Sequence, residues 1–224
     1  MKKSIYSEYG KGKLQCSPEL SNIANYLLLG SSYINDVSLF HGKAGAMLAL
    51  YSFSEKYHNP IFHEYADDLM QDIYKMVHDN LPIGIEQGLA GIGYAFTLLS
   101  NSDIIECDLN DVLYTIDHTI MCHDCRRMTD YTVKTGLFGV WLYICERMKS
   151  RQPITTFDNV YVNELNMVLK GQDGILKYNP AWLLNELKTP KYDSSEYLNK
   201  ELGIDNGCAY FLIKDSFYEV FCHQ

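Results

Sequence analysis

The chain lacks a hydrophobic run long enough to cross a membrane. A membrane-spanning helix needs about 20 consecutive apolar residues, and every apolar stretch here is interrupted well before that length. The first 15 residues, MKKSIYSEYGKGKLQ, contain lysines but are not followed by an apolar run, which excludes a secretory signal peptide. We therefore expect a protein without a membrane span.

Positive charge is also scarce. The chain has 19 Lys and Arg residues against 28 Asp and Glu residues, which gives a formal net charge of -9 at pH 7. Most of such a surface repels a nucleic-acid backbone or an anionic lipid surface. Nucleic acid and anionic membranes are therefore excluded as expected partners.

The cysteines do not form a disulfide framework. There are seven of them, an odd number, and their spacing is irregular. Without a signal peptide, this pattern favours reduced thiols in a cytoplasmic protein. The remaining composition, 47% hydrophobic and 21% charged, is that of an ordinary soluble globular protein.

The strongest pattern that is present is an internal repeat. The segments FHGKAGAMLAL, EQGLAGIGYAF and KTGLFGVWLYI each contain Gly-x-x-Gly followed by apolar residues, and a weaker copy, DNGCAYFLI, follows later. The spacing between the first glycines of the three full motifs is 46 and 48 residues, and the fourth comes 71 residues on, after an insertion. A near-constant period of this kind indicates a repeat architecture. We expect one domain over residues 1–224, with repeats led by Gly42, Gly88, Gly136 and Gly207.

Two kinds of helix alternate along this repeat. The glycine-led segments are apolar all round, as in residues 44–50 and 89–99, which is typical of a helix buried on all sides. Between them, residues 62–77, 109–120 and 160–169 place apolar side chains at helical spacing on one face only. The sequence therefore predicts an all-α fold with inner and outer helices, arranged as a curved or closed ring of hairpins or as an open solenoid.

The motifs also carry a family resemblance. SLFHGKAGAMLAL, EQGLAGIGYAFTLL, RMTDYTVKTGLFGVWLYI and GIDNGCAYFLI resemble successive inner-helix motifs of lanthionine synthetase C-like proteins, over residues 20–213. The resemblance implies an α/α toroid of helical hairpins, incomplete here, with about four inner-helix repeats where the family has seven. Zinc-bearing members of that family cyclise ribosomal peptides by adding a cysteine thiol to a dehydrated Ser or Thr.

The zinc ligands implied by the family are not found. In the cyclases, one Cys comes from a late repeat, and an adjacent Cys-His pair stands just before the inner-helix glycine of the next. Here the corresponding pairs are Phe40-His41, Glu86-Gln87, Lys134-Thr135 and Asp205-Asn206. We therefore predict no metal ligands and no cofactor. Zinc at Cys122, His123 and Cys125, or at Cys222 and His223, is the less favoured alternative.

Four residues are candidates for function. His41 stands next to Gly42 and is the candidate catalytic residue, because an imidazole transfers protons near neutral pH; packing at a turn is the alternative. Arg126, Arg127 and Asp130 form a candidate peptide-binding cluster, because arginines clasp carboxylates through paired hydrogen bonds. Helix capping and local ion pairs are the alternative for that cluster.

Three functions follow from the resemblance and the missing zinc motif. The first is a non-zinc accessory or peptide-binding component of ribosomal peptide modification. The second is an active peptide thioether cyclase with an unorthodox site, so enzyme activity stays open. The third is a non-catalytic interaction protein that binds a partner or a second copy at an open edge. The tail FLIKDSFYEVF is the expected edge, since the fourth inner helix has no outer helix after it in the sequence.

Overall fold

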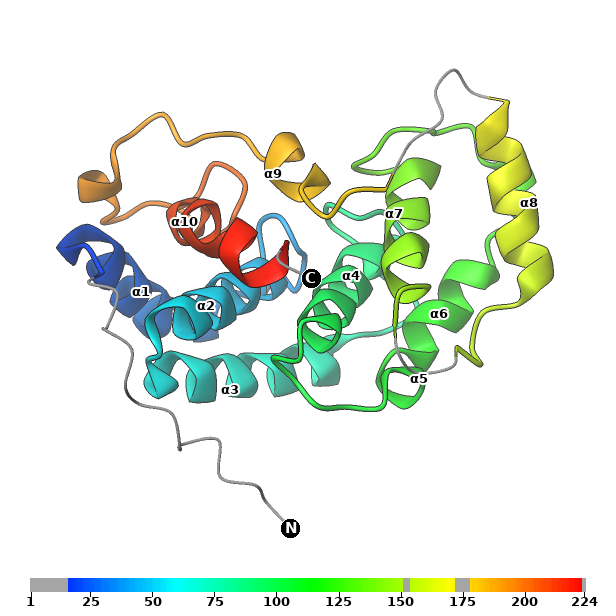
Figure 1. Ribbon diagram of the computed structural model, residues 1–224. Helices are drawn as coiled ribbons and strands as arrows, with labels where there is room; N and C mark the ends of the chain where they lie inside the picture. The colour runs from blue at the N-terminus through cyan, green and yellow to red at the C-terminus, as the bar shows by residue number, and fades with distance from the viewer. Residues whose placement is uncertain (1–15, 151–153, 172–177, 223–224) are drawn as a thin grey trace, which may run out of the picture.

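A computed structural model describes residues 16–150, 154–171 and 178–222, and within them every regular element is a helix (Figure 1). The all-α prediction is confirmed for this part of the chain. None of its helices is both long and apolar enough to span a membrane. The α-helices are α1 (Pro18–Gly30), α2 (Lys43–Tyr57), α3 (Pro60–Met76), α4 (Leu89–Asn101), α5 (Leu109–Val112), α6 (Tyr114–Met121), α7 (Leu137–Arg147), α8 (Asn159–Lys170), α9 (Trp182–Glu186) and α10 (Ala209–Phe221), and the short 3-10 helices are η1 (Ser31–Tyr33), η2 (Cys125–Arg127) and η3 (Ser194–Glu196).

The four glycine motifs open α2, α4, α7 and α10. Residues 43–54 of α2 and 89–99 of α4 are buried without interruption. By contrast, α3 buries only one side, through Phe62, Ala66, Leu69 and Ile73. The predicted distinction between helices buried all round and one-sided helices is confirmed for α2 and α4 against α3, because burial follows the distribution of apolar side chains around each helix. It is wrong for α10, which exposes Lys214, Tyr218 and Glu219.

Each glycine-led helix packs against an outer helix. In space the glycine-led helices follow the order α10, α2, α4, α7, each in contact with the next. The outer helix α3 packs on α2, α6 packs on α4, and α8 packs on α7. The core thus lies between two sets of helices, as expected of packed layers around one hydrophobic interior.

The outer helix of α10 is α1, which comes from the other end of the sequence. The blue α1 and the red α10 lie side by side, and α1 also contacts α2 (Figure 1). On α10 itself, Leu212, Ile213, Phe217 and Phe221 are buried. Helix α1 thus covers part of the tail that was expected to be an open edge, although Tyr218 is 53% exposed. Binding of a partner or a second copy there stays a prediction. The sequence order hid the pairing because α1 precedes all four motifs.

The glycines of the motifs mark close approaches of backbone to backbone. A Cβ atom on Gly88 would lie 2.0 Å from the carbonyl oxygen of Pro82, and one on Gly91 would lie 2.0 Å from that of Ile85. No side chain fits at such distances, so the entropic cost of glycine is offset by close packing. The same is true of five other motif glycines. An added Cβ would lie 2.2 to 2.4 Å from a backbone carbonyl oxygen at Gly42, Gly45, Gly136, Gly139 and Gly207.

The loops that enter the four helices share one backbone hydrogen bond. In each, the N–H after the first glycine donates to the carbonyl six residues before that glycine. The distances are 2.8 Å for Lys43 to Asp36, 2.7 Å for Leu89 to Pro82, 2.9 Å for Leu137 to Asp130 and 2.8 Å for Cys208 to Glu201. We call residues 36–42, 82–88, 130–136 and 201–207 the entry loops.

A buried ion pair joins α6 to α7. Arg147 donates from Nη2 to Oδ2 of Asp117 at 3.1 Å, and both side chains are fully buried. The hydroxyl groups of Thr156 and Tyr143 also donate to this carboxylate. Burial raises the pKa of Asp117, and the Arg147 guanidinium opposes that rise. Buried charges persist only when they are paired in this way.

The described residues between α8 and α10 contact two of the glycine-led helices. Tyr178 donates its hydroxyl hydrogen to Glu146 at the end of α7. Trp182 packs edge-on against Tyr94 of α4, with ring centres 5.0 Å apart. This is the insertion that lengthens the last repeat interval, and in space it connects α7 and α4 with the approach to α10.

Candidate functional site

A directional series of backbone hydrogen bonds joins the four entry loops. The N–H of Asp205 donates to the carbonyl of Phe40 at 3.0 Å, the N–H of Phe40 to that of Glu86 at 3.2 Å, and the N–H of Glu86 to that of Lys134 at 2.9 Å. Each of these residues stands two positions before the first glycine of its motif. Equivalent positions of the four repeats therefore lie in a row at the entrance to the glycine-led helices.

Four charged or titratable side chains meet at this row, and we call them the entry-loop cluster: His41, Glu86, Lys134 and Asp205. His41 Nε2 lies 3.4 Å from Glu86 Oε1 and 3.9 Å from Asp205 Oδ2. Lys134 Nζ lies 3.0 Å from the same Glu86 oxygen and 3.4 Å from the same Asp205 oxygen. The contact between Lys134 and Asp205 joins the first and last loops of the series.

The carboxylates of the cluster lie deeper than its nitrogen groups. The side chains of Asp205 and Glu86 are 2% and 16% exposed, against 25% for Lys134 and 33% for His41. Asp205 also accepts the N–H of Lys188 through its other oxygen at 2.5 Å. Two anions held this far from water require compensating charge, which the ammonium of Lys134 supplies.

Lys134 stays charged in this position. Burial lowers its pKa, but hydrogen bonds and charge interactions with Glu86 and Asp205 outweigh burial, so that the pKa is raised above its usual value. Its ammonium also lies 4.9 Å from the centre of the Phe40 ring, within cation–π range. The cluster thus contains a fixed positive charge between two fixed negative charges.

His41 is the one member of the cluster that the sequence singled out as a site residue. Its imidazole is one-third exposed and faces two carboxylates, an arrangement that suits proton transfer. A catalytic role stays a prediction. The sequence analysis missed Glu86, Lys134 and Asp205 as its neighbours, although their shared position two residues before each glycine was the signal that would have grouped them.

The predicted peptide-binding residues lie just before the third entry loop and at its first position. Arg126 donates to Asp124 at 2.9 Å and to Glu164 at 3.1 Å, and Arg127 lies 3.4 Å from Asp124 with its side chain strongly exposed. Asp130 accepts hydrogen bonds from Thr132 and Thr135 of its own loop. Peptide binding by these three residues stays a prediction, with Arg127 the most accessible of them.

One group of described residues has the proximity expected of metal ligands. The ligand atoms of His41, Glu86 and Asp205 all lie within 4.8 Å of one another. The alternative zinc residues do not gather: Cys122 is exposed, Cys125 is buried, and His123 Nδ1 lies 2.9 Å from a backbone carbonyl oxygen. Of the last pair, His223 lies outside the described residues.

Five of the seven thiols are poorly suited to activation. Burial raises the pKa of Cys145 and of Cys208 to about 12, and it also raises the pKa of Cys107, Cys125 and Cys222. Only the thiolate form is a good nucleophile or metal ligand. These five cysteines therefore stay protonated thiols near neutral pH.

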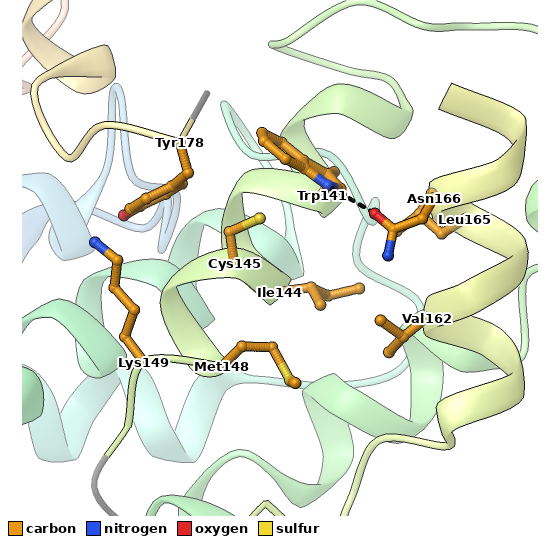
Figure 2. Close-up of a pocket in the computed structure, with 9 residues that line it drawn as sticks. All are labelled: Trp141, Ile144, Cys145, Met148, Lys149, Val162, Leu165, Asn166 and Tyr178. Atoms are coloured by element: carbon orange, nitrogen blue, oxygen red, sulfur yellow. Dashed lines mark hydrogen bonds between the residues drawn. The ribbon is translucent and has the colours of Figure 1, made fainter. Parts of the chain in front are cut away.

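A separate apolar cleft lies between α7 and α8. Figure 2 shows it opening between the two helices, with Tyr178 at one side and a hydrogen bond of 3.1 Å from Trp141 to Asn166 across it. Its volume is about 280 Å³. Pockets of this kind accept apolar groups. The lining residues are Trp141, Ile144, Cys145, Met148, Lys149, Val162, Leu165, Asn166 and Tyr178.

Comparison with known proteins does not assign the chain to a family. No family model matches it, and no curated protein matches it. The entry-loop cluster and the repeat are therefore the basis for a functional proposal.

Proposed function

We propose that the chain is a lanthionine synthetase C-like protein that binds a peptide without zinc. It would act as an accessory or peptide-binding component of ribosomal peptide modification. The observation that carries the proposal is the entry-loop cluster, in which the ammonium of Lys134 lies between the carboxylates of Glu86 and Asp205. This cluster lies at the entrance where the resemblance leads one to expect zinc-binding cysteines.

The proposal includes an incomplete α/α toroid as the fold. Its support is the spatial order α10, α2, α4, α7 and the outer helix on each member. The same entry-loop hydrogen bond in all four repeats adds to that support, as does the row of bonds that joins them. Repeats that present equivalent positions along one rim create an extended surface, which repeat proteins use for binding.

The chemistry of the rim suits recognition of a peptide. Lys134 and His41 are its more exposed members, and an ammonium and an imidazole can donate hydrogen bonds to peptide carbonyl or carboxylate oxygens. Arg127, just before the third entry loop, offers a second cationic group to an acidic leader. The cleft between α7 and α8 would take an apolar side chain of the same peptide.

The alternative of an active thioether cyclase has one observation in its favour. His41 lies near two carboxylates, as a proton-transferring imidazole does in many enzymes. Against it stands the ammonium of Lys134, which lies among the candidate ligand atoms. A metal-free binding protein therefore agrees better with the cluster than a zinc cyclase does.

Metal content and peptide affinity together test this proposal. Protein purified from zinc-supplemented medium should hold less than about 0.1 zinc per chain, since a structural or catalytic zinc site survives purification near full occupancy. A fluorescently labelled acidic leader-like peptide should bind, and Arg127→Glu should weaken binding about tenfold through loss of a charge-assisted hydrogen bond.

Lys170→Glu provides the matched control for the peptide measurement. Lys170 is exposed at the end of α8, so its reversal changes net charge by the same amount without touching the entry loops. If both variants weakened peptide binding equally, the change in net charge would explain the result, and the proposed peptide site would be contradicted. One zinc per chain would support the cyclase instead.

A further inference from the structure

We infer that His41, Glu86 and Asp205 form a cation site whose resident cation is the ammonium of Lys134, and that a divalent metal ion takes this site when the ammonium is removed. The inference goes beyond the proposed function and does not require peptide binding. It rests on the positions of four side chains from four entry loops.

The three ligand groups come from separate loops but face one point. Their nearest ligand atoms, an imidazole nitrogen and two carboxylate oxygens, lie within 4.8 Å of one another. A zinc ion binds such atoms at about 2.0 to 2.2 Å, so that two ligands of one ion lie up to about 4 Å apart. Small side-chain adjustments would therefore bring all three groups to bonding distance.

Lys134 contacts the oxygens that a metal ion would need. Its Nζ atom lies 3.0 Å from Glu86 Oε1 and 3.4 Å from Asp205 Oδ2, and His41 Nε2 faces these same two atoms. An ammonium group and a metal ion cannot share this space. The two cations therefore compete, and the wild-type chain already contains one of them.

Backbone hydrogen bonds position the residues of the site. Asp205 is almost fully buried, and its second oxygen accepts the backbone N–H of Lys188. The backbones of Asp205, Phe40 and Glu86 are joined in the row of hydrogen bonds. The Asp205 carboxylate is fixed by a backbone N–H and not by the lysine, so it stays in place when the lysine side chain is shortened or neutralised. Glu86 Oε1 is contacted by His41 as well as by Lys134, so one of these contacts remains.

Loss of the ammonium would leave two neighbouring carboxylates without the lysine that pairs with them. Uncompensated buried carboxylates are costly, and a bound metal ion is one way to relieve that cost. Because the ammonium contacts both carboxylate oxygens, metal binding should appear on substitution of Lys134.

The test compares metal affinity in three variants. Lys134→Met removes the ammonium and keeps a side chain of similar length, Lys134→Arg keeps a cation, and the double variant Lys134→Met with His41→Gln removes one ligand. With Co²⁺ as the spectroscopic probe, Lys134→Met should bind one ion per chain at least about tenfold more tightly than the wild type. Lys134→Arg should resemble the wild type, and the double variant should lose the gain.

Three outcomes with these variants would overturn the inference. The first is a folded Lys134→Met variant, checked by circular dichroism, that binds Co²⁺ no more tightly than the wild type. The second is a double variant that keeps the full gain, since the ion would then lie elsewhere. If Lys134→Met is unfolded without metal, Co²⁺ should restore its thermal transition, because a ligand of the native state stabilises it; an unfolded variant that metal does not restore also contradicts the inference.

A measurement on the wild-type protein tests the resident cation directly. An ammonium held by two carboxylates exchanges its protons slowly, so the Lys134 ammonium should give a resolved nitrogen–proton signal in NMR spectra that Lys134→Arg lacks. Absence of that signal would contradict the inference. If the wild-type protein contained zinc and the His41→Gln variant kept it, the proposed function would be contradicted but this inference would not. If Lys134→Met showed no gain in Co²⁺ affinity, this inference would be contradicted but the proposed function would not.

Discussion

At Gly91 a single added methyl group would meet backbone on one side and a neighbouring repeat on the other. Its Cβ would lie 2.0 Å from the Ile85 carbonyl oxygen and 2.9 Å from Cβ of Leu39 in the preceding entry loop. Neither neighbour is the flexible end of a side chain, so the backbone itself would have to move. The glycine is therefore required by the contact between repeats.

We expect Gly91→Ala to destabilise the protein. Forcing extra volume into a packed interior costs about 1 to 3 kcal/mol, although alanine alone would favour a helix. Urea unfolding followed by circular dichroism measures the change. Gly171→Ala is the control, because its nearest contact would be at 3.6 Å and its expected effect is within about 1 kcal/mol. Similar losses in both variants would contradict the close-packing explanation.

The entry-loop cluster shows how far residue types could be interpreted without the structure. His41 was identifiable because imidazole is the usual group for proton transfer near neutral pH. Glu86, Lys134 and Asp205 share a position two residues before a motif glycine, but the sequence analysis considered that position only for Cys-His pairs. Their contacts depend on the lateral distance between entry loops, which helix packing sets and a motif does not state.

Among the elements, the pairing of α1 with α10 is the contact that the sequence order concealed. Leu27 of α1 is fully buried, whereas Leu29, two residues on, is 70% exposed. The two leucines therefore differ in burial while sharing residue type and helix. Alanine substitutions at these two positions change helix propensity equally, so a difference between them measures the packing contribution of α1.

We expect Leu27→Ala to cost about 2 to 5 kcal/mol of unfolding free energy, the usual range for a buried leucine. Leu29→Ala should change it by no more than about 0.5 kcal/mol, as for other surface sites. Chemical denaturation of the two variants measures both. If Leu27→Ala had no larger effect than Leu29→Ala, α1 would not be an integral outer helix of the fold.

For the whole molecule, the row of backbone hydrogen bonds connects all four entry loops. Its donors are the amides of Asp205, Phe40 and Glu86. Breaking one of these bonds requires two neighbouring repeats to separate, since each loop is also tied to its own helix. The row should therefore open only when the molecule unfolds as a whole.

Hydrogen exchange provides the measurement. The amides of Phe40, Glu86 and Asp205 should exchange with the free energy of global unfolding, within about 1 kcal/mol of one another. The amide of Arg126, which bonds to the partly exposed side chain of Asp124, should exchange much faster by local opening. Exchange of Glu86 at the rate of Arg126 would show that the repeats separate independently.

The sequence by itself determined the helical class, the four glycine motifs and the difference between helices buried all round and one-sided helices. These features follow from local composition and periodicity, which act within a few turns of chain. It also determined that no Cys-His pair precedes a motif glycine.

Only the tertiary structure decided which helices are neighbours and which side chains meet. The pairing of α1 with α10 and the meeting of His41, Glu86, Lys134 and Asp205 join residues far apart in sequence. Such contacts depend on how the packed layers are arranged around the core, because each helix can satisfy its apolar face against several partners. The position of Lys134 between two carboxylates is the result of that arrangement.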